Sequence, residues 1–236
     1  MTQYSVVIPI YNEQDNIEPL ISELEAVMSA YKDTWELIFV DDGSPDSSGL
    51  ILKRLCSEKP FLRTLRFKNN AGQTAALQAG FKAAKGEYVI TLDGDGQNDP
   101  KDIPHLIAIA KLGYDLVAGK RRHRQDSQTK RVISKFANFI RQKILADGIS
   151  DTGCSLKVYR KSALDKIPLY KGMHRFLPAL FLIEGFSVKE VEVEHRPRIA
   201  GKSKYTIFNR GLALAFDLLA VWWMKKRKLS YEVESS

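Results

Sequence analysis

The chain has 236 residues, 44% of them hydrophobic, which is enough for one sizeable α/β domain or one domain with a short appendage. Its two cysteines, Cys56 and Cys154, lie far apart and fit neither a zinc motif nor a CxxC motif, so we expect reduced thiols in a cytoplasmic setting. The first residues run directly into an apolar strand pattern without the layout of a signal peptide, so we expect no export.

The positive charge is concentrated in one segment. Residues 120–143 contain nine Lys and Arg against a single acid, Asp126, whereas the rest of the chain has 27 basic and 27 acidic residues. This segment therefore carries the whole net charge of +8. Such an excess indicates an anionic partner at a defined place, with nucleic acid, a lipid phosphate and a membrane surface as candidates. A plain solvated run of charge is the alternative.

Strand and helix patterns alternate along the chain. Apolar runs predict strands over residues 5–11, 35–40, 62–67, 87–92 and 114–118. Helical spacing and capping residues predict helices over 15–31, from the loop at 41–46 to about 57, over 73–84 and over 100–112. This alternation predicts an α/β fold with a mostly parallel, doubly wound sheet. No GxGxxG follows the first strand and no Walker loop occurs, so dinucleotide binding and P-loop chemistry are unsupported.

Acidic and polar residues follow three of these strands. Tyr11-Asn12-Glu13, Asp41-Asp42 and Asp93-Gly94-Asp95-Gly96 each stand where a strand is expected to end. Ligands in such folds bind at the carboxyl ends of the strands. We therefore expect the three segments to converge on one edge of the sheet.

The segment Asp93-Gly94-Asp95-Gly96 is the most informative of the three. Two carboxylates at i and i+2 on glycine turns can bind one hard divalent cation, and oxygen ligands suit Mg²⁺ or Mn²⁺. Gln97-Asn98-Asp99 adds further oxygen ligands directly afterwards. A polar surface turn is the alternative for an isolated motif of this kind. The place of the motif after an expected strand favours a site for a metal and a nucleotide.

Five segments together resemble family 2 glycosyltransferases. They are Ser-Val-Val-Ile-Pro-Ile-Tyr-Asn-Glu at 5–13, Phe-Val-Asp-Asp-Gly-Ser-Pro-Asp at 39–46, Asn70-Ala71-Gly72, the run at 86–97, and Arg198-Ile-Ala-Gly201-Lys-Ser203-Lys204. Within that family the chain is most similar to the dolichol-phosphate and bacterial polyprenyl-phosphate glycosyltransferases, over about residues 5–228. The resemblance implies a GT-A fold and metal-dependent transfer of a sugar from a nucleotide sugar, GDP-mannose or a UDP-hexose, to a polyprenyl or dolichyl phosphate.

The same resemblance implies roles for particular residues. The base and ribose of the donor would contact Pro9, Tyr11, Glu13, Asp41 and Asp42, and the metal that bridges the diphosphate would be bound by Asp93, Asp95 and Gln97. Arg198 and Lys204 would contact the donor and acceptor phosphates, and the acceptor phosphate would also meet Arg121, Arg131 and Ser134. Asp151 matches an acidic position near the sugar, although Ser155-Leu156-Lys157 stands where the family often has an aromatic–arginine pair. The Gln-x-x-Arg-Trp motif of processive members does not occur, which indicates one sugar per turnover.

The chemistry needs no strong general base. Cleavage of a glycosyl–diphosphate bond puts negative charge on the leaving group, which a metal held by Asp93 and Asp95, together with Arg198 and Lys204, would stabilise. A phosphate monoester has a second pKa of about 6 and is largely ionised at neutral pH. We therefore interpret Asp151 as an orienting residue rather than an obligatory base, and we expect a single displacement that inverts the anomeric centre.

Other interpretations stay open at this point. The same motifs suit a family 2 enzyme with a soluble or glycan acceptor. A sugar nucleotidyltransferase also uses paired Asp residues, but it usually has a Gly-rich basic loop where Pro9-Ile-Tyr-Asn-Glu13 stands. A nucleic-acid-binding module would use the basic segment, which lacks interleaved aromatic residues, and would leave the acidic segments unexplained. We therefore expect no nucleic acid partner.

Two segments suggest contact with a membrane surface. Residues 130–147 place Ile133, Phe136, Ala137, Ile140 and Ile144 on one helical face and cations on the other, as in an interfacial helix, with an ordinary surface helix as the alternative. Residues 212–224 are apolar except for Asp217, are too short to cross a bilayer and precede four cations at 225–228, which suits an in-plane anchor. We expect a glycosyltransferase domain over 1–205, with an acceptor- and membrane-facing segment at 120–147, and an interfacial helix with a basic tail over 206–236. The chain would be peripheral on the cytoplasmic face of a membrane.

Overall fold

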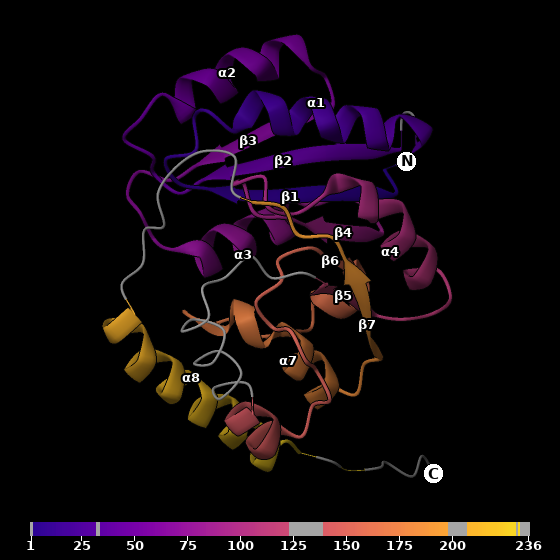
Figure 1. Ribbon diagram of the computed structural model, residues 1–236, viewed down its shortest axis with the longest axis vertical. Coiled ribbons are helices and arrows are strands. Elements are labelled where there is room, and N and C mark those ends of the chain that lie inside the picture. Colours follow the sequence, from indigo (N-terminus) through magenta and orange to yellow (C-terminus); the bar gives the residue numbers. More distant parts are fainter. Residues whose placement is uncertain (1, 32–33, 123–138, 198–206, 230, 232–236) are drawn as a thin grey trace, which may run out of the picture.

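The computed structural model describes residues 2–31, 34–122, 139–197, 207–229 and 231, and only the backbone within 207–213. The described chain forms one sheet of seven strands with helices on both faces (Figure 1). The strands are β1 (Tyr4–Ile10), β2 (Trp35–Asp41), β3 (Leu62–Arg66), β4 (Tyr88–Thr91), β5 (Leu116–Arg121), β6 (Lys157–Arg160) and β7 (Val188–Val193).

The helices alternate with the strands in the first half of the chain. The α-helices are α1 (Ile17–Met28), α2 (Ser48–Glu58), α3 (Gln73–Ala83), α4 (Ile103–Ala110), α6 (Lys161–Leu164), α7 (Leu177–Ile183) and α8 (Ile207–Arg227). The 3₁₀ helices are η1 (Ser29–Tyr31), η2 (Pro100–Asp102) and η3 (Met173–Phe176). Residues 139–145 are also helical.

The sheet has the order β3-β2-β1-β4-β6-β5-β7 and is mostly parallel. β1 pairs in parallel with β2 and β4, β2 with β3, and β5 with β7. Only β6 runs antiparallel to its neighbours β4 and β5. Because β6 is reversed, its first residue, Lys157, pairs with Thr91 at the end of β4. The start of β6 therefore lies at the edge where the parallel strands end.

Two apolar cores lie on the two faces of the sheet. Successive residues of a strand point to opposite faces, and in β1 Val6 and Ile8 join one core while Val7 joins the other. The first core contains the buried faces of α1, α2 and α4, and the second contains those of α3, α6, α7 and α8. Burial on both faces explains why the central strands read as continuous apolar runs.

The elements predicted up to residue 121 are confirmed, with boundaries that shift by a few residues. The helix expected over 15–31 is α1 followed by η1, and the one expected over 100–112 is η2 followed by α4, which ends at Ala110. The elements between 157 and 193 were not predicted. β7, with the sequence Val-Lys-Glu-Val-Glu-Val, carries an alternating pattern that would have identified it.

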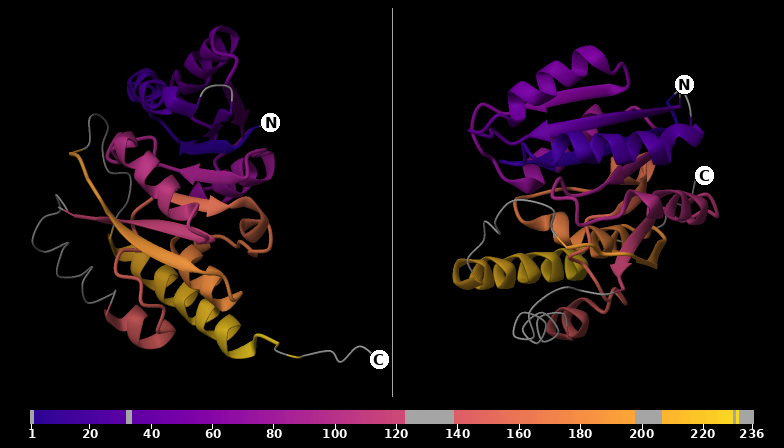
Figure 2. Two further views of the ribbon diagram at one scale, coloured as in Figure 1. Left: turned by 90° about the vertical axis from the view of Figure 1, so that its right-hand side faces the viewer. Right: turned by 45° about the horizontal axis from the view of Figure 1, so that its top comes forward.

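In Figure 1 and in both views of Figure 2, α8 lies on the far side of the domain from α1 and α2. It contains the apolar stretch 212–224 on which an in-plane helix was expected. Its inner side packs into the second core through Val221, which is fully buried, and through the partly buried Leu214, Leu218 and Met224. Its outer side exposes four large apolar side chains, Phe216, Leu219, Trp222 and Trp223.

α8 is fixed to its neighbours at its C-terminal end. Lys228 Nζ lies 3.3 Å from Glu184 Oε2 just after α7, and Lys225 Nζ donates a hydrogen bond to the carbonyl oxygen of Leu145. Of the apolar residues expected on one face of 130–147, the described ones are Ile140, which is exposed, and Ile144, which packs on the second core. No helix among the described residues is long and apolar enough to span a membrane.

Candidate functional site

The ends of β1, β2 and β4 meet at one edge of the sheet, as predicted. The amide of Asp42 donates to the carbonyl oxygen of Ile10 at 2.9 Å, and the amide of Asn12 donates to Ser44 Oγ at 3.0 Å. Asn12 has a φ of +54°, in the left-handed region that Asn tolerates better than most residues. The chain therefore turns sharply after β1 and places residues 11–13 beside the loop after β2.

Asp42 holds the loop that precedes α3. Its carboxylate accepts hydrogen bonds from Asn70 Nδ2 at 2.9 Å, from the amide of Ala71 at 2.7 Å and from the amide of Gly72 at 2.9 Å. Gly72 has a φ of +92°, which favours glycine. The expected donor-binding Asp42 thus builds the Asn70-Ala71-Gly72 segment into the site, a role that the sequence did not disclose.

The other residues expected to bind the donor lie at the same edge. Asp41 is fully buried and accepts from the amide of Ser44 at 2.8 Å, and its second oxygen lies 3.4 Å from Arg66 Nε. Glu13 Oε2 accepts a hydrogen bond from Asn16 Nδ2 at 2.7 Å. Pro9 is in β1, and Tyr11 follows that strand half-buried. Their contact with a nucleotide stays a prediction.

The segment from Asp93 to Gln97 forms a tight, largely buried turn after β4. The amide of Gln97 donates to Asp95 Oδ1 at 3.1 Å, and Gln73 Nε2 at the start of α3 donates to Asp93 Oδ1 at 2.9 Å. A Cβ at Gly94 would lie only 2.6 Å from Ile10 Cγ2, so glycine is needed for the close approach to β1. Sequence reasoning identified both carboxylates but missed Gln73 as a partner of Asp93.

The two carboxylates repel each other in a buried setting. Burial, and then the neighbouring charge of Asp95, raises the pKa of Asp93 to about 6, against the opposing effects of Ser155, Lys157 and Arg121. A divalent cation would relieve this repulsion, and the donor set of carboxylate and amide oxygens suits Mg²⁺ or Mn²⁺. The residues therefore fit the expected metal. No group of three His, Cys, Asp or Glu side chains with metal-binding spacing occurs among the described residues, so the set of Asp93, Asp95 and Gln97 stays a prediction.

Asp151 is held by a bidentate ion pair with Arg121. Arg121 Nε donates to Oδ2 at 2.7 Å and Nη2 to Oδ1 at 2.8 Å, and the two side chains are 14% and 8% exposed. Glu190 of β7 accepts hydrogen bonds from the amides of Ser150 and Asp151 at 2.9 and 2.8 Å, which fixes the loop. Arg121 was expected on the acceptor phosphate, and in this structure its guanidinium orients Asp151.

Lys157 places a buried cation beneath the site. It begins β6, is 4% exposed, and its Nζ donates to the carbonyl oxygen of Cys154. Burial lowers the pKa of Lys157, while the nearby Cys154, Asp93 and Asp151 act in the opposite direction. Because β6 is reversed, Lys157 comes close to Asp93, which lies far away in the sequence. Lys157 is one of the three residues that stand where the family often has an aromatic–arginine pair.

Acidic neighbours neutralise part of the basic segment. Arg141, 4% exposed, pairs with Asp147, and Arg122 lies 3.8 Å from Glu192 and 3.9 Å from Glu194. With Arg121, three cations of the segment therefore face carboxylates of this chain. The remaining expected acceptor residues of this segment, Arg131 and Ser134, lie outside the described residues.

The chain returns to the turn at residues 93–97 shortly before residue 198. The amide of Arg196 donates to the carbonyl oxygen of Gln97 at 2.9 Å, and Asn98 forms an antiparallel bridge with His195. The Arg196 guanidinium lies 2.5 Å from Asp99 and 2.7 Å from Glu23. The segment that leads into Arg198 and Lys204 is thus anchored at the turn. Those two residues themselves lie outside the described residues.

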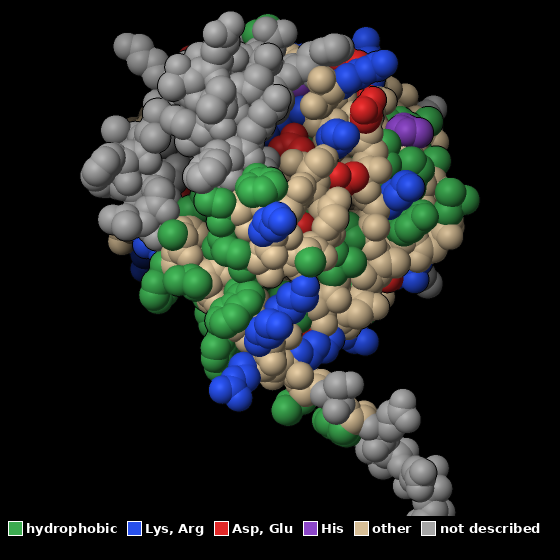
Figure 3. All heavy atoms as spheres, turned by 60° about the horizontal axis from the view of Figure 1, so that its bottom comes forward, with side chains coloured by type: hydrophobic (Ala, Val, Ile, Leu, Met, Phe, Trp, Pro, Cys, Tyr) green, Lys and Arg blue, Asp and Glu red, His purple; other side chains and the backbone are tan. Residues whose placement is uncertain are grey.

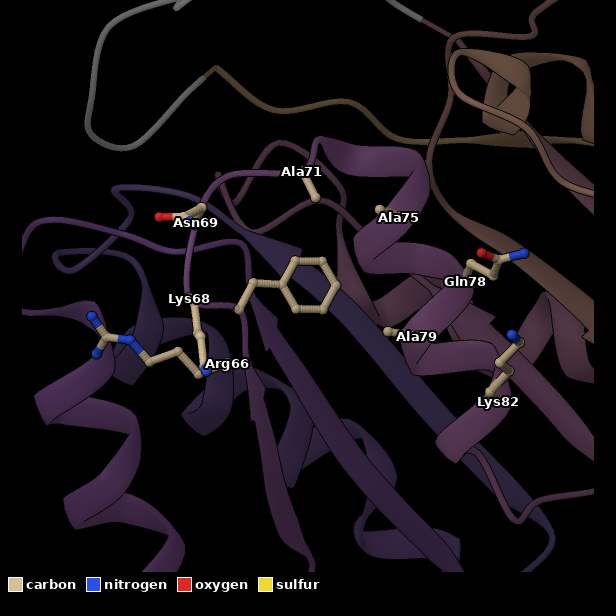
Figure 4. Close-up of a pocket in the computed structure, with 9 residues that line it drawn as sticks. Arg66, Lys68, Asn69, Ala71, Ala75, Gln78, Ala79 and Lys82 are labelled. Atoms are coloured by element: carbon tan, nitrogen blue, oxygen red, sulfur yellow. The ribbon is translucent and has the colours of Figure 1, made fainter.

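An open hollow of ≈ 560 Å³ lies beside the acidic edge rather than in it (Figure 4). It is lined by the end of β3 and by α3, with Phe67, Ala71, Ala75 and Ala79 as its apolar part and Arg66, Lys68 and Lys82 as its cations. None of the described residues that line it is acidic. Its composition does not match a metal–diphosphate site, and the acidic edge stays the candidate.

Comparison with solved structures shows the fold. The structure matches glucosyl-3-phosphoglycerate synthase from Mycobacterium tuberculosis, solved in complex with Mn²⁺, uridine diphosphate and glucosyl-3-phosphoglycerate, with a TM-score of 0.71. The identity is 19%, and the match covers 95% of this chain and 80% of the other. The α/β fold with its mixed, mostly parallel sheet is thus that of GT-A proteins, as expected from the sequence.

Sequence comparison is more specific. The chain is 38% identical over 231 residues to a dodecaprenyl-phosphate galacturonate synthase from Rhizobium johnstonii, covering 96% of this chain and 68% of that protein. It is 39% identical over 217 residues to an undecaprenyl-phosphate 4-deoxy-4-formamido-L-arabinose transferase from Pseudomonas fluorescens, covering 91% and 63%. The chain thus spans about two thirds of the length of these relatives. The model of the family named Glycosyl transferase family 2 matches residues 5–168, and the chain belongs to this family.

Proposed function

We propose that this chain transfers a single sugar from a nucleotide sugar, GDP-mannose or a UDP-hexose, to a polyprenyl phosphate, with inversion at the anomeric centre. The observation that carries the proposal is the pair Asp93, half-buried, and Asp95, buried, at the edge where β1, β2 and β4 end and close to the Arg121–Asp151 pair. The names of relatives that are 38–39% identical supply the acceptor class.

The donor would bind along the acidic edge. Pro9, Tyr11, Glu13, Asp41 and Asp42 would surround its base and ribose. Asp93, Asp95 and Gln97 would hold Mg²⁺ or Mn²⁺, which neutralises the charge that develops on the departing diphosphate. Arg198 and Lys204 would add positive charge at the same phosphates. Gln73 and Gly94 support this arrangement, because they hold Asp93 and allow the turn to approach β1.

The acceptor phosphate would enter beside Asp151, near Arg121, Arg131 and Ser134. A carboxylate paired through both oxygens with an arginine is held in one orientation. The lipid phosphate is itself largely ionised at neutral pH. This supports Asp151 as a residue that orients Arg121 and the acceptor, without an obligatory role as a base.

We further propose that the protein attaches to a membrane surface, on the cytoplasmic face, without crossing it. Figure 3 shows hydrophobic side chains gathered next to a row of Lys and Arg on the face that includes α8. The outer side of α8 exposes Trp222 at 40% and Trp223 at 59%, and Lys225, Lys226 and Arg227 follow in its last turn. Exposed tryptophan with cations suits an anionic leaflet, such as the cytoplasmic one.

Incubation with a panel of nucleotide sugars, Mn²⁺ and a polyprenyl phosphate tests the chemical proposal. We expect a glycosyl phosphoryl polyprenol and one released nucleoside diphosphate per sugar for one of the donors. Asp95→Asn should lose this transfer. The matched control is Asp15→Asn, which changes an exposed carboxylate outside the proposed metal-binding set and should keep it. Release of pyrophosphate would instead indicate a nucleotidyltransferase, and transfer only to a water-soluble acceptor would exclude the lipid acceptor.

Vesicle sedimentation tests the attachment separately. Replacement of Trp222 and Trp223 by Ser should reduce sedimentation with vesicles of phosphatidylglycerol and phosphatidylcholine, and high salt should release the native protein. Replacement of Leu50 and Leu112, which are 72% and 79% exposed elsewhere, is the matched control and should have no effect. Equal loss in both double variants, or no sedimentation of the native protein, would refute the proposed surface.

A further inference from the structure

The first residues of α3 contact both the acidic edge and the turn before η3, which in turn contacts α8. At the site end, Gln73 donates to Asp93, and the amides of Ala71 and Gly72 donate to Asp42. The next residue along the chain, Thr74, contacts the turn before η3 instead. Thr74 is 6% exposed and accepts a hydrogen bond from the amide of Gly172 at 3.0 Å. Its Oγ1 also lies 2.7 Å from His174 Nδ1.

Helix α8 packs on this turn. Gly172 has a φ of +87°, and a Cβ at this position would lie 2.2 Å from Asp217 Oδ2. The Asp217 carboxylate of α8 therefore packs directly on the backbone of the turn. Burial raises the pKa of Asp217, the one acid in the apolar stretch of the helix.

The contacts form one continuous chain across the domain. Asp217 of α8 touches Gly172, Gly172 donates to Thr74, and the adjacent Gln73 holds Asp93. The inner side of α8 also packs on the same core as α3, through Val221 and Leu77. Coupling between distant sites is carried by packed side chains and hydrogen bonds of this kind. Three contacts thus connect α8 to the turn at residues 93–97.

From this we infer that Thr74 is a positioning residue that couples the docking of α8 on a membrane to the placement of Asp93, so that the metal and donor bind more tightly on the membrane than in solution. The inference rests on the proposed function, because it assumes the metal at Asp93 and the membrane on the outer side of α8. The outer side of α8 lies opposite Asp217 and Val221, the residues through which the helix contacts the turn and the core. Thr74 itself contacts no substrate.

Mn²⁺ binding measures the coupling without any sugar transfer. Mn²⁺ would be titrated by electron paramagnetic resonance in the presence of UDP, with GDP in parallel, and with or without vesicles of phosphatidylglycerol and phosphatidylcholine. We expect the native protein to bind Mn²⁺ at least about fivefold more tightly on the vesicles, at the low end of measured couplings between sites. Thr74→Val removes the hydroxyl at nearly constant volume and should bring this ratio to about one, while sedimentation with the vesicles is unchanged.

Three further variants make the result specific. Thr74→Ser keeps the hydroxyl and should restore the ratio. Thr34→Val removes a hydroxyl that donates to the carbonyl oxygen of Tyr31, away from the acidic edge, and should leave the ratio unchanged. Asp217→Ala removes the contact with Gly172 from the α8 side and should lower the ratio even if Thr74→Val does not fold.

The outcomes separate the two proposals. If the native protein binds Mn²⁺ equally with and without vesicles, or if Thr74→Val and Asp217→Ala both keep the native ratio, the coupling is refuted and the proposed function stands. If no Mn²⁺ binds under any condition, the metal site of the proposed function fails, and the coupling fails with it.

Discussion

Arg121 binds Asp151 through both carboxylate oxygens, Nε to Oδ2 at 2.7 Å and Nη2 to Oδ1 at 2.8 Å. The pair joins the end of β5 to the loop before β6, two segments that are 30 residues apart. Both side chains are mostly buried, and each is a close counter-charge for the other. Any substitution of Arg121 thus changes Asp151 as well, which affects how its role at the acceptor can be tested.

Arg121→Ala should therefore reduce stability as well as activity. Removing one partner leaves a buried charge uncompensated, and we expect a loss of about 3 kcal/mol in the free energy of unfolding. Denaturant titration of Arg121→Ala, Asp151→Ala and the double variant measures the pair as a double-mutant cycle. The double variant should recover part of the loss. Strict additivity of the two single changes would show that the pair contributes nothing.

An effect on the acceptor needs a subtler change. Arg121→Lys keeps the charge and loses the bidentate geometry. If Arg121 and Arg131 bind the lipid phosphate, Arg121→Lys combined with Arg131→Ala should raise KM for the lipid far more than KM for the nucleotide sugar. Steady-state kinetics with each substrate varied in turn give this comparison. Equal increases in both would place the residues in donor binding or in folding.

Asp93→Asn should abolish metal binding without loss of the fold. We expect transfer to fall by about a hundredfold or more, because the metal no longer stabilises the leaving diphosphate. The melting temperature without metal should stay the same or rise, since the change removes the repulsion from Asp95. Thermal melts with and without Mn²⁺ provide the measurement, and Mn²⁺ should stabilise Asp15→Asn but not Asp93→Asn. Full activity of Asp93→Asn, or of chelator-treated enzyme, would contradict the metal assignment.

The pKa of Asp93 gives a pH dependence with a definite sign. Its pKa is raised from 3.8 to about 6, so the folded state binds the proton more strongly than the unfolded state. The contribution of Asp93 protonation to the free energy of unfolding is therefore fully present below about pH 3.8 and is lost as the pH rises through about 6. Mn²⁺ binding has the opposite trend, because it requires the ionised carboxylate. We expect Mn²⁺ affinity to fall as the pH is lowered from 7 to 5, and a flat profile would contradict the shift.

Cys154 should be inert in the folded protein. Burial raises the pKa of its thiol to about 11, so at pH 8 only about one molecule in a thousand is the reactive thiolate. In Cys56→Ser, a disulfide reagent at pH 8 should titrate no thiol within minutes in the native state and one after denaturation. Rapid reaction of native Cys56→Ser would show that the loop at 151–157 opens.

The site residues that directly follow a strand could be predicted from the sequence. Asp42, Asp93 and Asp95 each follow an apolar run, and the rules for parallel sheets place such residues on one edge. Their partners could not be found in this way. Gln73 and Lys157 contribute through packing of α3 and β6, and neither position has a local pattern that indicates its neighbour.

The charge pattern also shows a limit of sequence reasoning. The basic segment appears as a continuous excess, yet the structure pairs Arg121 with Asp151 and Arg141 with Asp147. The carboxylates that pair with these cations follow the segment in the chain, so counting charge within a window separates them. Predictions at Arg131, Ser134, Arg198 and Lys204 depend on the family resemblance alone.

The reversed strand β6 has a consequence for how the protein is made. β6 lies between β4 and β5 although it follows both in the chain, so a nascent chain that ends before residue 157 leaves two strand edges unpaired in the middle of the sheet. Such edges promote association between chains. The arrival of β6 closes the gap and, in the same event, places Lys157 beside Asp93 and Asp151. The connection of β5 to the rest of the sheet and the placement of Lys157 beside Asp93 are therefore completed together, after about two thirds of the chain has been translated.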